Sequence, residues 1–150
     1  MIDAENKIYD TVATAVRTTY GTTYPTLTVY SDYVLSPTSF PCVTLIEADN
    51  STYTPSQDDS LQEHHAVVMF EANVYTDKAS GAKSLAKQIA NTVDTTMQNM
   101  KFTRTMRMQT PNVDTTIYRI TMRYEAIIEQ PTVDSNGNKT YQMYRSRTNR

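Results

Sequence analysis

The chain is short of the residues on which many enzymes rely. It has one cysteine, three glycines and no tryptophan in 150 residues. A single cysteine excludes an internal disulfide framework and suits a reducing compartment. So few glycines leave little material for the phosphate-binding loops of nucleotide enzymes, because those loops need positive φ or a close backbone approach. We therefore expect no nucleotide site and no cofactor.

Charge and hydropathy argue against two further classes of protein. The net charge is −2, whereas a general nucleic-acid binder shows a clear basic excess. No apolar run approaches the roughly 20 residues that span a bilayer. The first residues also lack the apolar stretch of a signal peptide. We expect a soluble, unexported protein without a membrane partner, and its length suits about one domain.

The residues that are abundant favour β structure. The chain has 25 threonines and 11 tyrosines, which suit pleated, half-buried surfaces. Periodic patterns predict, in order, a helix over about 3–20, strands at 27–30, 40–47 and 63–76, a helix from Asp77 or Ser80 to Asn99, and strands at 102–109 and 116–128. This order predicts an α+β fold, a mainly antiparallel twisted sheet with two helices packed on one face.

The long strand over 63–76 has two unlike faces. One face is apolar, and the other carries Met69 and Tyr75 beside polar residues. Two explanations fit the second face: burial against another subunit, or cover from within the same domain. In the strand at 102–109, strict alternation would place Arg104 with Met106 and Met108, opposite Arg107.

Two regions read as additions to this core. Residues 49–62 are polar and predict a loop. After Pro131, the dipeptide Asn136-Gly137 predicts a hairpin whose two-residue turn would set Asp134 opposite Lys139. The last residues from Tyr144 are basic and read as a frayed tail. We divide the chain into a domain at 1–130 and a C-terminal hairpin and basic tail at 131–150, with the hairpin resting on the domain or on a partner.

Charge is unevenly distributed along the chain. From Glu47 to Asp77 there are seven acids and no Lys or Arg, including Asp58, Asp59 and Glu63. The hairpin at 101–128 holds five cations: Lys101, Arg104, Arg107, Arg119 and Arg123. Each group can be a solvated face. Alternatively, the acids and cations can complement each other between copies of the chain, or the arginines can face DNA. The candidate interface or channel residues are Glu47, Asp58, Asp59, Glu63, Met69, Tyr75, Arg104, Arg107, Tyr118, Arg119 and Arg123.

The sequence offers little evidence for a catalytic site or a metal site. His64 and His65 are adjacent on a predicted strand, so their side chains point to opposite faces and do not readily share a metal. Cys42 sits in an apolar strand, where cysteine usually acts as a small buried hydrophobe. A hydrolase built on Cys42 and a histidine is the enzymatic alternative. We predict no metal, no catalytic residue and no enzyme.

The layout resembles a known family. The segments that carry the resemblance are Phe40-Pro41-Cys42-Val43, Phe70-Glu71-Ala72-Asn73-Val74-Tyr75, and Ile117-Tyr118-Arg119-Ile120-Thr121-Met122-Arg123-Tyr124-Glu125-Ala126 after the Pro111 loop. Over roughly residues 1–129 the chain is similar to the tail terminator proteins of long-tailed bacteriophages, also called tail-completion or head–tail joining proteins.

This resemblance implies a structural role in the virion. It implies a ring, usually a hexamer, that assembles in the host cytoplasm and caps the tail tube at its head-proximal end. The partners would be sibling copies, the tail tube protein and the head connector, with DNA passing through without specific binding. The alternatives are a head-completion or neck protein, and a nucleic-acid-binding module that uses the arginine hairpin.

Overall fold

The structure is a computed structural model that describes residues 1–34, 36–56, 58, 63–79, 82–112 and 114–146. Its elements are α1 (Glu5–Tyr20), β1 (Thr28–Tyr30), β2 (Cys42–Thr52), a 3₁₀ turn η1 (Thr54–Ser56), β3 (His65–Asp77), α2 (Ala82–Asn99), β4 (Thr103–Gln109), β5 (Ile117–Glu129), β6 (Thr132–Val133), β7 (Lys139–Thr140) and β8 (Met143–Arg145). The α+β class predicted from the sequence is confirmed.

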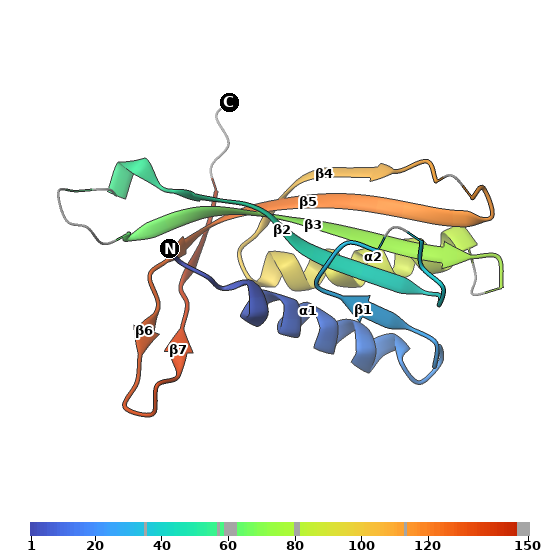
Figure 1. Cartoon of the computed structure of the whole chain (residues 1–150), viewed down its shortest axis with the longest axis horizontal. Helices are drawn as coiled ribbons and strands as arrows, with labels where there is room; N and C mark the ends of the chain where they lie inside the picture. Colours follow the sequence, from blue (N-terminus) through green and yellow to red (C-terminus); the bar gives the residue numbers. More distant parts are fainter. Residues whose placement is uncertain (35, 57, 59–62, 80–81, 113, 147–150) are drawn as a thin grey trace.

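One twisted sheet forms the body of the molecule (Figure 1). Among the described residues, its strands follow the order β1–β2–β3–β5–β4, and β8 also pairs with β5. Only β1 runs parallel to its neighbour in this set; the other pairs are antiparallel. Both helices lie side by side on one face, α1 against β2 and α2 against β3 and β5. The predicted arrangement of two helices on one face is therefore confirmed.

The core lies between the helices and this face of the sheet. Each helix contributes an apolar stripe at 3.6-residue spacing. The stripe of α1 is Ile8, Val12, Ala13 and Val16, and the stripe of α2 is Leu85, Ala86, Ile89, Ala90, Val93 and Met97. The strands supply alternate residues, led by Phe70, Met122 and Tyr124, which are all fully buried. Burial of one face in this way sets the register of both long strands.

The β2 strand is longer than its sequence suggests. Residues 49–52 were expected in a loop, but they pair with β3 from Asp49↔Met69 to Thr52↔Ala66. A β-bulge between Glu47 and Asp49 shifts the register and lets pairing continue. The expectation of a loop at 49–52 was wrong because hydrogen bonding to the long β3 outweighs the weak strand propensity of these polar residues.

A second bulge changes the faces of β4. The register with β5 shifts between Arg104 and Met106, so Arg104 pairs with Tyr124 and Arg107 with Met122. Both partners lie on the helix side of the sheet. Arg104 and Arg107 therefore share the face toward the helices, whereas Met106 and Met108 lie opposite. The alternation expected for this strand was wrong, because the extra residue reverses every later side chain.

The C-terminal residues also differ from expectation. The hairpin turn spans five residues rather than two, so Lys139 pairs with Val133, and the Asp134 N–H donates to the Asn138 carbonyl at 3.0 Å. Gly137, with φ of +82°, supplies the left-handed conformation that this turn needs. Tyr144 and Arg145 belong to β8 on β5 and are not frayed. The β6–β7 hairpin projects from the body (Figure 1).

Neither helix in the described part of the chain has both the length and the apolar character that crossing a membrane requires.

Candidate assembly surfaces

The sheet has an open face, opposite the helices. We define the open face by Val67, Met69, Glu71, Asn73 and Tyr75 of β3 and by Arg119, Thr121, Arg123, Glu125 and Ile127 of β5. Their pairing is direct across the two strands, from Val67↔Ile127 to Tyr75↔Arg119. The structure thus brings together four predicted residues, Met69, Tyr75, Arg119 and Arg123.

One end of the open face is closely packed. Tyr75 is buried, and the Arg119 guanidinium lies 5.2 Å from the centre of its ring. Arg119 Nε donates to Asn73 Oδ1 at 3.0 Å, and Thr121 Oγ1 donates to the same oxygen at 2.8 Å. Burial raises the pKa of Tyr75, and the charge of Arg119 opposes that rise. Arg119 is therefore engaged within the chain by two partners.

The other end of the open face is more exposed and more apolar. Arg123 Nε lies 3.8 Å from Glu71 Oε1, and the Arg123 side chain is half exposed. The residues around this pair are half-buried and mostly aliphatic or sulfur-containing: Val67, Met69, Met106 and Ile127. Met108 is 47% exposed at the edge of this region. Thioether and aliphatic side chains beside one exposed arginine are typical of interface cores.

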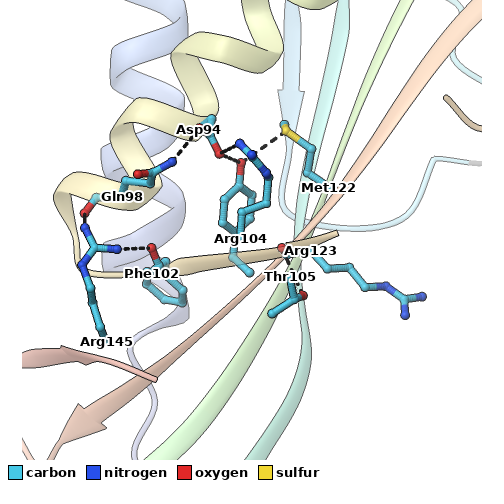
Figure 2. A network of polar contacts seen from close by, with 9 residues as sticks. Asp94, Gln98, Phe102, Arg104, Thr105, Met122, Arg123 and Arg145 are labelled. Carbon is cyan, nitrogen blue, oxygen red and sulfur yellow. Dashed lines mark hydrogen bonds and ion pairs between the residues drawn. The ribbon is translucent and has the colours of Figure 1, made fainter. Parts of the chain in front are cut away.

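Arg104 belongs to a network on the helix side (Figure 2). Its Nη1 lies 2.9 Å from Asp94 Oδ1 of α2, and the fully buried Tyr124 donates its hydroxyl to the same oxygen at 2.8 Å. Gln98 Nε2 donates to Asp94 Oδ2 at 2.7 Å. Burial and the bond to Asp94 raise the pKa of Tyr124 far above its usual range. The network joins α2 to β4 and β5, so Arg104 contributes to the fold.

Arg107 contributes to a second feature, which we call the cationic cleft. The cleft has a volume of about 240 Å³ and is lined by Lys83, Lys87, Arg107, Met108, Gln109, Tyr118 and Ile120. Lys83 Nζ lies 6.0 Å from the centre of the Tyr118 ring. The Tyr118 hydroxyl donates to Gln109 Oε1 at 3.1 Å. The contribution of α2 was missed from the sequence, because two lysines on a polar helix face look like solvated charges.

Glu47 belongs to a third feature, the acidic edge, made by Asp3, Glu5 and Glu47. One carboxylate oxygen from each lies within 4.8 Å of the others. Burial raises the pKa of Glu47, and the charges of Glu5 and Asp3 raise it further. Asn50 Nδ2 opposes the rise by donating to Glu47 Oε1 at 2.7 Å. The three carboxylates of the acidic edge therefore repel one another, and a cation placed nearby would stabilise them.

A family model, described as tail completion protein gp17, matches residues 7–129. The chain belongs to this family. The resemblance inferred from the sequence is confirmed, and the protein is a structural component of a phage tail and hence of the virion. A search of curated proteins finds no match.

Of the other predicted acids of this tail completion protein, Glu63 lies beside the acidic edge, because it lines one pocket together with Asp3. Glu63 accepts the Ile2 N–H through Oε1 and the Thr52 hydroxyl through Oε2, each at 2.9 Å. Asp58 lies 3.0 Å from His64 Nε2. Asp59 lies outside the described residues. Among the predicted acids that the structure describes, Glu47 belongs to the acidic edge, Glu63 lies beside its Asp3, and Asp58 lies by His64.

The tail completion protein does not bring its cysteine and histidines together. Cys42 is fully buried, and burial raises the pKa of its thiol. It pairs with Tyr75 at one end of β3, whereas His65 begins that strand. Ten residues of strand separate the two positions by about 33 Å. His65 Nε2 instead lies 3.9 Å from Glu129 Oε1. The nucleophile and base of a cysteine hydrolase do not meet in this fold.

Proposed function

We propose that the protein forms a homo-oligomeric ring, a hexamer, that caps the tail tube and ends its polymerisation. The ring would join the tube to the head connector and let DNA pass through its centre. Membership of the tail completion family supports the placement in the tail. The ring and its six subunits are what the resemblance to tail terminator proteins implies, and the surfaces of the chain support this proposal.

The observation that carries the proposal is the exposed end of the open face. Val67, Met69, Met106 and Ile127 are half-buried in the single chain, and both helices lie on the other side of the sheet. A neighbouring subunit or the tube that covered these side chains would remove apolar surface from water, at roughly 25 cal/mol per Å². Arg123 and Glu71 would then lie inside the contact and help to set its register.

The charge balance supports passage of DNA without tight binding. The net charge is −2, and three of the four hairpin arginines have partners in the chain. Arg104 lies against Asp94, Arg119 against Asn73 and Tyr75, and Arg123 near Glu71. A specific nucleic-acid site would instead present free cations in a stripe.

The proposal is tested by electron microscopy and native mass spectrometry of the purified protein, with and without isolated tail tubes. We expect rings that bind one end of each tube. The variant Met69→Glu should weaken assembly strongly because it places a charge in the contact. Thr14→Glu, on the exposed side of α1, is the matched control and should assemble normally.

Two results would contradict this function. A protein that stays monomeric on tail tubes would refute the ring. A protein that ignores tubes but binds the portal end of DNA-filled heads would favour the alternative of a head-completion or neck protein.

A further inference from the structure

The cationic cleft concentrates positive charge that the described part of the chain does not neutralise. Lys83 and Lys87 come from α2 and Arg107 from β4, and the lining includes no carboxylate. No described Asp or Glu lies within ion-pair distance of any of these three cations. Lys83 is also in the first turn of α2, which has no acidic residue, although helix dipoles favour anions there. The cleft is therefore suited to an anionic group from outside.

The shape and chemistry of the cleft favour carboxylates on a protein segment. Tyr118 and Ile120 provide an apolar floor beside the cations. Such a floor can contact the methylene stem of a glutamate or aspartate while the cations contact its carboxylate. The phosphates of a nucleic-acid backbone would contact the cations but not this apolar floor.

The acidic edge and the cationic cleft lie toward opposite edges of the same sheet. Glu47 is on β2 and Arg107 on β4, with β3 and β5 between them. Three strand spacings of about 4.8 Å separate the two strands by about 14 Å. The two features therefore do not neutralise each other within one chain. A two-fold contact can pair cleft with edge only where both features lie in one self-complementary patch, so their placement on opposite edges of the sheet favours a head-to-tail contact.

We propose that the cationic cleft of one copy receives the acidic edge of the next copy around the ring. This inference rests on the proposed ring and names the residues that join its subunits: Lys83, Lys87 and Arg107 on one side, and Asp3, Glu5 and Glu47 on the other. The contact relieves the mutual repulsion of three close carboxylates and supplies the cleft with its missing anions. It sets the direction and register of association.

Charge reversal with complementation tests the contact. The cleft variant carries Lys87→Glu and Arg107→Glu, and the edge variant carries Asp3→Lys and Glu5→Lys. Each variant alone would set like charges against each other at every interface. We expect association at least about tenfold weaker for each by sedimentation velocity. An equimolar mixture should restore rings when the two variants alternate. The acidic cleft of the cleft variant then receives the lysine-bearing edge of the edge variant, and the wild-type cleft of the edge variant receives the wild-type acidic edge of the cleft variant. A hexamer has an even number of subunits, so this alternation closes.

The control variant reverses two exposed cations outside both features, Arg17→Glu and Lys101→Glu. It changes net charge as much as the cleft variant and should assemble like the wild type. Circular dichroism melting of each variant verifies folding, and restored rings in the mixture require two folded partners. The wild-type ring should also weaken as salt is raised.

Several results would overturn the proposal. Normal rings from either variant alone, or no restoration in the mixture of folded variants, would refute the contact while leaving the ring intact. Normal rings from the cleft variant with lost retention of double-stranded DNA would assign the cleft to phosphate instead. A wild-type protein that forms no ring on tail tubes would refute both the contact and the proposed function.

Discussion

The network around Asp94 offers a sharp test of how this fold is held together. The change is Asp94→Ala, which removes the acceptor of the buried Tyr124 hydroxyl and the partner of Arg104 (Figure 2). The hydroxyl keeps only a contact with Met122 Sδ at 3.2 Å, and sulfur is a weak acceptor. Tyr124 has no exposed surface, so the loss of the carboxylate leaves its buried hydroxyl poorly satisfied.

The cost can be estimated from these contacts. A hydrogen bond to a charged group contributes about 1.5–3 kcal/mol. The Arg104 side chain is 40% exposed, so solvent screens its ion pair with Asp94 to below about 1 kcal/mol. We expect Asp94→Ala to lower the free energy of unfolding by about 2–4 kcal/mol. Asp94→Asn keeps an acceptor for the Tyr124 hydroxyl and should lower the free energy of unfolding by less than Asp94→Ala does.

The assay is urea denaturation at one fixed protein concentration, because association would otherwise change the apparent stability. A double-mutant cycle with Tyr124→Phe should give a coupling of about 1–2 kcal/mol between the two side chains. Asp10→Ala, at an exposed acid on α1, is the control and should fall within about 0.5 kcal/mol of wild type. Equal losses for Asp94→Ala and Asp10→Ala, or a coupling near zero, would refute this account of the network.

Two further predictions follow from buried titratable groups. Because the pKa of Tyr124 is raised from 10.0 by burial and by Asp94, the unfolded chain loses this proton first. Stability should therefore fall above about pH 10, by up to about 1.4 kcal/mol per unit from this residue. Denaturation curves of Tyr124→Phe should show a shallower fall, and identical slopes would contradict the assignment. The Cys42 thiol is buried and its pKa is raised, so a disulfide reagent should label it only after unfolding. Rapid labelling of the native protein would show that this end of β2 opens.

The two long strands and the second helix could be predicted from local patterns. Alternation along β3 and β5 and the 3.6-residue stripe of α2 are properties of short segments, and the burial of one face enforces them. The alternation places Met69 and Tyr75 on one face of β3 and Arg119 and Arg123 on one face of β5, and only the pairing of the two strands brings these faces together. Two of the three segments that carry the family resemblance, 70–75 and 117–126, lie in these strands.

The two bulges and the pairing of β8 could not be predicted in this way. A bulge adds one residue without any compositional signal, so the face of Arg104 and Arg107 depended on hydrogen bonding to β5. Polar residues 49–52 became a strand because β3 was long enough to pair with them. These errors concern places where a distant strand decides the conformation.

The sequence by itself determined the fold class, the apolar faces and the family, because each depends on periodicity or on order along the chain. Only the tertiary structure decided which charges meet. It joined Arg104 to Asp94, moved Arg107 to a cleft with two lysines of α2, and set Glu47 beside Asp3 and Glu5. Coulomb interactions act over a few ångströms of space whatever the separation in sequence, so charge runs in the chain do not predict charged surfaces on the molecule.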